Sequence, residues 1–181
     1  RVLTAPIPAT RDPFVNTPLL ALTPDARGRQ RFWTSSYNNV VGCLGVLVTE
    51  DGDARVYRFN DRRLAGFYSA VQESDDILWL CGDLSQVVRL DLRSGAVECF
   101  ATGAPAALVF QGMHLDRDSG KLMAIAFPPP HTCAFSFDTK TCKPVKVYRD
   151  LCPDHYMRHS FPNGDGTVSF VLHCPGETLA R

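Results

Sequence analysis

The amino-acid sequence predicts an all-β fold of antiparallel sheets that repeat about every 45 residues. Apolar runs recur at this spacing, centred on Trp33, Trp79, Met123 and Ser169. Turn sequences such as Asp51-Gly52 and Ser94-Gly95 recur with the same period. Short segments alternate apolar and polar residues, as in 88–92, and no long segment has helical periodicity.

Each repeat divides into four short strands separated by Gly, Pro, Asp and Asn. In the second repeat the expected strands are 69–72, 77–81, 87–92 and 96–100. In the third repeat they are 112–115, 122–127, 133–137 and 145–148. Four strands in a period of 40 to 50 residues are typical of a β-propeller blade. We therefore expect one propeller domain, or part of one, over 1–181, with blades at about 17–60, 67–100, 110–150 and 157–181, the last incomplete.

This count favours a fragment of a larger ring of seven or eight blades. A closed four-bladed ring is the alternative within the same fold, and residues 1–14 could supply its closing strand or belong to a preceding blade. A β-sandwich is the alternative fold, which the regular spacing disfavours. A fragment would need the missing blades of its parent chain as partners, because an isolated piece exposes apolar blade faces.

Composition excludes several classes of protein. Hydrophobic residues make up 45% and charged residues 21%, which is typical of a globular chain. Lys plus Arg total 19, and Asp plus Glu also total 19. The chain therefore lacks the excess of basic residues that is typical of a protein with a nucleic-acid partner. No apolar run is long enough to span a bilayer, so we expect no membrane partner.

The chain has 7 cysteines and no C-x-x-C pair. We interpret them as small buried hydrophobic residues, and we expect no metal site. Unpaired thiols favour a cytoplasmic location, and a secreted location stays open if a signal peptide has been removed. The sequence identifies no cofactor.

The second repeat carries the clearest family resemblance. Segments 76–80, 86–92 and 94–100 read DILWL, QVVRLDL and SGAVECF. This pattern resembles the repeat of streptogramin-lyase-like and NHL-type propellers. The resemblance implies the blade fold, and a blade repeat specifies a fold better than an activity.

Propeller geometry predicts where a site would lie. The inner strand of each blade starts on one face of the disc, and the loop between the second and third strands returns to that face. Side chains from both places should converge on the central channel. The predicted substrate-binding residues are Tyr37, Tyr68, Gln111, Asp83, His131 and His173.

The segment 155–159 is the densest cluster of reactive side chains. Arg158 can hold a carboxylate with two hydrogen bonds. His159, Tyr156 and His114 can act as general bases or acids. Together these four candidate catalytic residues suit β-elimination from a uronic acid. The alternative interpretation is that they are polar groups packed near the channel.

The opposite face carries Asp-, Asn- and Gly-rich turns, including 116–120, which we interpret as turn chemistry. Trp33 and Trp79 occupy equivalent positions and are expected in the core.

These observations favour a β-propeller that binds an anionic small molecule or saccharide at the channel. Cleavage by a lyase or a glycoside-cleaving reaction is the catalytic version of this hypothesis, and the sequence leaves open whether the protein is an enzyme. The alternative is a non-catalytic protein-interaction or sensor propeller, which a contiguous exposed apolar patch would favour.

Overall fold

The computed structural model describes residues 15–16, 19–37, 43–59, 66–82, 86–104, 109–127, 133–149, 151, 156–165 and 167–173. All regular elements in these ranges are β-strands, which confirms the all-β prediction. No helix in the described part of the chain has the length and apolar character needed to cross a membrane.

The first sheet, blade 1, contains five strands. They are β1 (Val15–Asn16), β2 (Leu20–Leu22), β3 (Arg31–Tyr37), β4 (Cys43–Thr49) and β5 (Ala54–Phe59). Both β1 and β2 pair antiparallel with β3, so they share one position in the order of strands.

Blades 2 and 3 are four-stranded antiparallel meanders. Blade 2 contains β6 (Phe67–Ser74), β7 (Ile77–Gly82), β8 (Gln86–Asp91) and β9 (Val97–Ala101). Blade 3 contains β10 (Val109–Asp116), β11 (Lys121–Phe127), β12 (Cys133–Asp138) and β13 (Lys143–Tyr148). These are the two sets of four strands expected from the second and third repeats.

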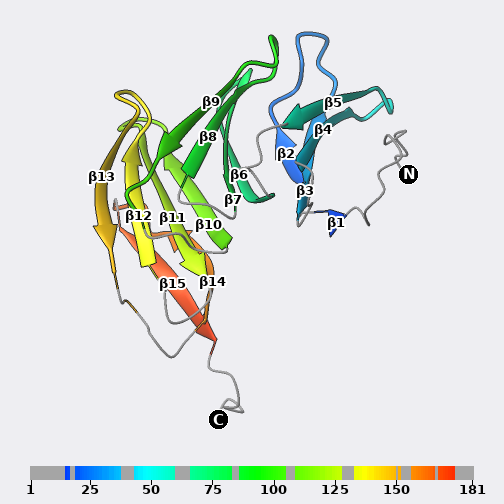
Figure 1. Ribbon diagram of the computed structural model, residues 1–181. Coiled ribbons are helices and arrows are strands. Elements are labelled where there is room, and N and C mark those ends of the chain that lie inside the picture. Colours follow the sequence, from blue (N-terminus) through cyan, green and yellow to red (C-terminus); the bar gives the residue numbers. More distant parts are fainter. Residues whose placement is uncertain are drawn as a thin grey trace.

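The fourth sheet, blade 4, pairs β14 (Tyr156–Pro162) with β15 (Val168–His173). The sheets follow one another side by side in chain order (Figure 1). The first strand of blade 3, β10, contacts the first strands of blades 2 and 4, β6 and β14. The first strands are therefore the inner strands, and they line a common channel. The limits of the domain and of its blades stay a prediction.

Burial on both faces of a blade is clearest in β7. Successive side chains of a strand point to opposite faces of the sheet. Leu78 and Leu80 belong to the apolar cluster shared with blade 1, whereas Trp79 and Cys81 belong to the cluster shared with blade 3. A sheet buried on both faces needs a nearly continuous apolar strand, which explains the sequence of residues 77–81.

The two tryptophans are core residues, as predicted: Trp33 is 1% exposed and Trp79 is 0% exposed. The ring of Trp33 lies 5.6 Å from that of Tyr57, and Trp79 lies 5.8 Å from Phe100. Trp33 also covers Gly45 so closely that an added Cβ would overlap its ring. Glycine at this position makes room for the indole.

The cysteine prediction holds only in part. Cys81 and Cys133 are buried in the core between blades 2 and 3, but Cys99 is exposed. Cys99 lies on β9, which has mostly exposed side chains. Among the described residues, Cys81, Cys99, Cys133 and Cys142 form no disulfide.

Polar groups fasten blade 1 to blade 2 beside the apolar core. The side chain of Arg31 is only 8% exposed and forms an ion pair with Asp76 at 3.6 Å. Its guanidinium also donates to the carbonyl oxygen of Thr23 at 2.8 Å and to that of Asp75 at 2.6 Å. These bonds satisfy a charge that would otherwise be costly to bury.

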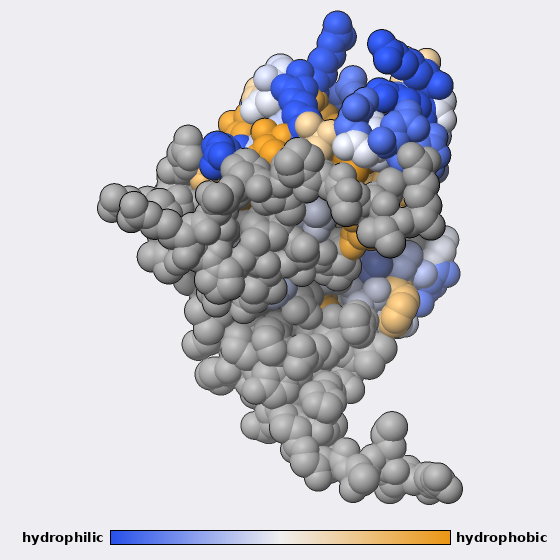
Figure 2. All heavy atoms as spheres, turned by 90° about the vertical axis from the view of Figure 1, so that its right-hand side faces the viewer, coloured by the Kyte–Doolittle hydropathy of each residue, from blue (hydrophilic) through white to orange (hydrophobic). Residues whose placement is uncertain are grey.

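Aspartates close the turns of blades 2 and 3. Asp91 accepts from the backbone N–H groups of Ser94 and Arg93, and these bonds lower the pKa of its carboxyl. The pKa of Asp116 is lowered by the hydroxyl and the N–H of Ser119. Hydrophilic residues gather along the upper edge of the molecule in Figure 2.

Substitution of Gly45 by alanine should destabilise the protein, because the new methyl group must displace the Trp33 ring. Overpacking of this kind costs about 1–3 kcal/mol. Urea unfolding measures the loss. In a Trp33→Leu background the same substitution should cost much less, and equal costs in both backgrounds would contradict the packing explanation.

The aspartate-capped turns predict a loss of stability in acid. The folded-state pKa values of Asp91, Asp116 and Asp138 lie below the unfolded value of 3.8. Their contribution is therefore complete above about pH 4 and is lost as the pH falls through the lower folded values. Urea midpoints between pH 6 and pH 3 test this. The triple Asp→Asn variant should show a shallower decline, and an unchanged slope would assign the decline to other groups.

Candidate functional site

The inner strands share an irregularity where they line the channel. Pairing of β6 with β7 shifts between Phe67 and Ser69, which leaves Tyr68 as an extra residue. Pairing of β14 with β15 shifts between Met157 and His159, so Arg158 takes the same role. Bulges of this type redirect a side chain and are frequent beside functional sites.

Blades 1 and 3 carry the corresponding shift. In blade 1, Asn16 pairs with Ser36 whereas Leu20 pairs with Trp33, a change of one residue in register. In β10 the shift lies between Gln111 and His114. The four inner strands therefore bend at comparable positions, although their residues there have no common sequence.

Blades 3 and 4 meet closely at the bulge of β10. Gly112 has a left-handed φ of +59°, and a Cβ at this position would lie 3.1 Å from the backbone nitrogen of Ser160. The hydroxyl of Ser160 donates to the carbonyl oxygen of Gly112 at 2.6 Å. Nε2 of His114 lies 2.5 Å from the carbonyl oxygen of Ser160. These contacts hold the half-buried His114 ring against blade 4.

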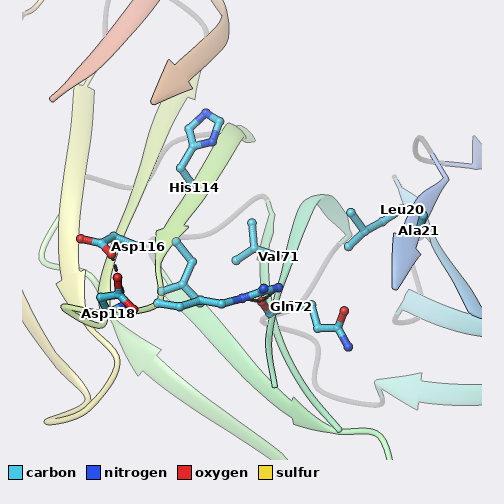
Figure 3. A pocket seen from close by; sticks show the side chains of 9 residues that line it. Leu20, Ala21, Val71, Gln72, His114, Asp116 and Asp118 are labelled. Atoms are coloured by element: carbon cyan, nitrogen blue, oxygen red, sulfur yellow. Dashed lines mark hydrogen bonds between the residues drawn. The ribbon is translucent and has the colours of Figure 1, made fainter. Parts of the chain in front are cut away.

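A cavity of about 500 Å³ opens between the inner strands of the first three blades. Figure 3 shows Leu20 and Ala21 on one side, Asp116 and Asp118 on the other, and His114 above them. The cavity is lined by Leu20, Ala21, Val71, Gln72, His114, Leu115, Asp116, Arg117 and Asp118.

Arg117 is anchored at this cavity by a forked hydrogen bond. Its Nε and Nη2 atoms donate to the carbonyl oxygen of Gln72 at 3.0 and 2.9 Å. Gln72 is itself held by blade 1, because its Oε1 accepts from the N–H of Thr23 at 2.9 Å and its Nε2 donates to the Thr23 hydroxyl at 2.8 Å. A guanidinium has five N–H donors, so this fork leaves others available.

The charge of Arg117 has no carboxylate partner within ion-pair distance in the described part of the chain. The neighbouring carboxylate of Asp116 is committed to its own turn. It accepts from the Ser119 hydroxyl at 2.6 Å and from the Asp118 N–H at 3.1 Å. The cavity thus combines an anchored cation, an imidazole and an apolar wall.

A second cavity of about 470 Å³ lies between blades 3 and 4 and shares His114 with the first. The turn after β10 and the turn after β14 form its walls, with Lys121 and Thr167 among the lining residues. Within the described residues, no group of three or more His, Cys, Asp or Glu side chains is placed to hold a metal ion.

Among the predicted site residues, His114 lines both cavities and Tyr68 is half-buried on β6. Tyr156 pairs in register with His173 across β14 and β15. For the remaining strand residues the structure describes the backbone position: Tyr37 on β3, Gln111 on β10, and Arg158 and His159 on β14. Asp83 and His131 lie outside the described residues. These site assignments stay predictions.

The cavity lies at the end of the channel opposite to the predicted face. The hydrogen bonds of Asp116 support the interpretation of 116–120 as a turn. The sequence pattern does not indicate a role for Arg117 or Gln72 in a site. One signal in the sequence could have indicated Arg117. It is a basic residue in the turn after an inner strand, whereas the corresponding turn of blade 2 carries the acidic residues Asp75 and Asp76. Only the packing of neighbouring blades shows that Arg117 reaches the channel.

Comparison with known proteins identifies the fold class. No protein-family model and no curated protein matches the chain in sequence. A solved structure, dihydro-heme d1 dehydrogenase NirN in complex with DHE, matches 73% of this chain with a TM-score of 0.53 and 11% identity. The match spans 28% of the NirN chain.

The chain has the β-propeller fold, as the repeat predicted, and the β-sandwich alternative is wrong. At 11% identity the similarity to NirN shows the fold alone. The finer resemblance to streptogramin-lyase-like and NHL-type repeats stays a prediction, as does the number of blades in the ring.

The close approach of blades 3 and 4 predicts that Gly112→Ala destabilises the protein more than Gly164→Ala. Both glycines have a left-handed φ, +59° and +81°, but only Gly112 has atoms crowding the new methyl group. The difference should be about 1–2 kcal/mol, since overpacking adds to the backbone cost. Chemical denaturation of both variants measures it. Equal losses of stability in the two variants would mean that the junction of blades 3 and 4 accommodates the methyl group at no cost in free energy.

Proposed function

We propose that the channel cavity of this propeller binds an anionic small molecule, with Arg117 as the residue that receives its negative charge. The observation that carries this proposal is the forked bond from Arg117 to the Gln72 carbonyl oxygen, at 3.0 and 2.9 Å. The fork fixes the guanidinium at the cavity and leaves N–H donors for a ligand.

The cavity has the size and composition of a small-molecule site. Its volume of about 500 Å³ falls within the usual range for such pockets. Leu20, Val71 and Leu115 supply apolar contact, while Arg117 and His114 supply polar groups from one side. The solved structure of NirN, which shares the fold, is a complex with DHE. A propeller of this type therefore offers a precedent for small-molecule binding.

Preorganisation supports the same proposal. Gln72 is fastened to Thr23 by two hydrogen bonds, and Arg117 is fastened to Gln72, so blades 1, 2 and 3 all position the cation. A side chain already held in its binding geometry loses little entropy when a ligand arrives. Asp116 and Asp118 also line the cavity and repel an anion, so the ligand's negative charge must lie close to the Arg117 guanidinium.

Binding and cleavage of a saccharide at the predicted face, the end of the channel opposite to Arg117, form a second and more specific hypothesis. In this hypothesis a uronic acid is bound, and Arg158, His159 and Tyr156 act with His114 in a lyase reaction. Its support is the position of β14, which is adjacent to β10 and carries Arg158 at the bulge.

The interaction-module alternative receives less support from the described surface. Its large exposed apolar residues are spread over blades 2, 3 and 4 and the connecting segments. They are Leu19, Val97, Val145, Leu151 and Phe161.

Replacing Arg117 by glutamine should weaken the binding of quinate and D-glucuronate at least about tenfold, because a charge-assisted pair contributes about 1.5–3 kcal/mol. Isothermal titration calorimetry gives the dissociation constants. Arg93→Gln is the matched control, since it removes the same charge from an exposed turn outside the cavity. Equal weakening by both variants, or by neither, would contradict a specific role for Arg117.

A further inference from the structure

We infer that the ligand of the channel cavity is a hydroxy-carboxylate, whose carboxylate binds Arg117 and whose hydroxyl donates to Nδ1 of His114. This inference rests on the proposed function and names the substrate class of the same cavity. It follows from the one hydrogen bond that fixes the His114 ring.

The Ser160 carbonyl oxygen determines which nitrogen of His114 carries the hydrogen. A carbonyl oxygen only accepts hydrogen bonds, so Nε2, at 2.5 Å from it, must be the donor. In the neutral imidazole the other nitrogen, Nδ1, then has a lone pair and accepts. The tautomer is assigned from this hydrogen-bond geometry.

The partner that fixes the ring is itself rigid. Ser160 is 6% exposed, and its hydroxyl is bound to the Gly112 carbonyl oxygen at 2.6 Å. Movement of the Ser160 backbone would therefore disturb the junction of blades 3 and 4. These contacts hold the His114 ring in one orientation, with Nδ1 as its acceptor. A histidine without such a partner could rotate.

His114, which carries the acceptor, lines the same cavity as Arg117 and also lines the second cavity. His114 and Arg117 both line the 500 Å³ space, although Ser160 does not. In Figure 3 the His114 ring and the Val71 side chain both point toward the top of the view. Nε2 is directed to blade 4, so the lone pair of Nδ1 is the part of the ring that is left for a ligand.

These groups together define the ligand. Arg117 calls for a carboxylate, Nδ1 of His114 calls for a hydroxyl or N–H donor, and the apolar wall of Leu20, Val71 and Leu115 accepts a carbon skeleton. A carboxylate without hydroxyl groups offers Nδ1 no donor. A hydroxyl that donates to Nδ1 adds a hydrogen bond worth about 0.5–1.5 kcal/mol, or up to about tenfold in affinity.

The test compares quinate, a tetrahydroxylated cyclohexanecarboxylate, with cyclohexanecarboxylate itself. The two ligands share one carbon skeleton and one carboxylate, so their affinity ratio reports the hydroxyl groups. Calorimetry on the wild-type protein should give a dissociation constant for quinate severalfold, and up to about tenfold, below that for cyclohexanecarboxylate.

Two variants separate the roles of the two ring nitrogens. His114→Gln keeps an amide N–H at the position of Nε2 for the Ser160 carbonyl but loses the acceptor at Nδ1. Its affinity ratio should fall to about one while its Tm stays near that of the wild type. His114→Asn places an amide oxygen near Nδ1 but cannot reach Ser160, so it should keep part of the ratio and lower the Tm.

A wild-type ratio near one, or an undiminished ratio in His114→Gln, would overturn the hydroxy-carboxylate inference. If Arg117→Gln then still weakens the binding of both ligands, the proposed anion site stands without the hydroxy-carboxylate inference. If neither ligand binds, or if both bind Arg117→Gln as tightly as the wild type, the proposed function fails together with the inference.

Discussion

The structure depends on the burial of apolar side chains on both faces of a blade, as blade 2 shows. Leu78 and Leu80 require blade 1 as a neighbour, while Trp79 and Cys81 require blade 3. Neither face of blade 2 can be left in water without exposing large apolar side chains. The blades are thus stable only as a series, in the way that repeat proteins derive stability from contacts between neighbouring units.

The same dependence between blades builds the channel. Arg31 and Thr23 of blade 1, Gln72 of blade 2 and Arg117 of blade 3 form a continuous chain of hydrogen bonds. Ser160 and His114 continue the contact into blade 4. Polar groups that satisfy one another across the junctions also place a cation and an imidazole at one cavity. The interactions that support the structure therefore also position the groups of the proposed site.

Much of the fold could be predicted because the repeat is written in local patterns. Alternating strands, Asp- and Gly-rich turns and the equivalent Trp33 and Trp79 all depend on short-range sequence, and the structure agrees with them. The site was harder to predict. His114 was chosen for its chemistry and lines the cavity, whereas Arg117 was missed because its turn looked purely structural. The position of its guanidinium depends on the carbonyl oxygen of Gln72, which lies 45 residues away in the chain.

Local sequence accounts for the four-stranded repeat, the apolar strands that are buried on both faces, and the turns, because period, alternation and turn chemistry act within a few residues. The tertiary structure decided which charged groups meet. The register shifts of the inner strands, the tautomer of His114 and the anchoring of Arg117 all depend on atoms of neighbouring blades. These contacts between blades do not recur with the repeat, because each is made by a single residue of one blade. The sequence pattern therefore does not reveal them.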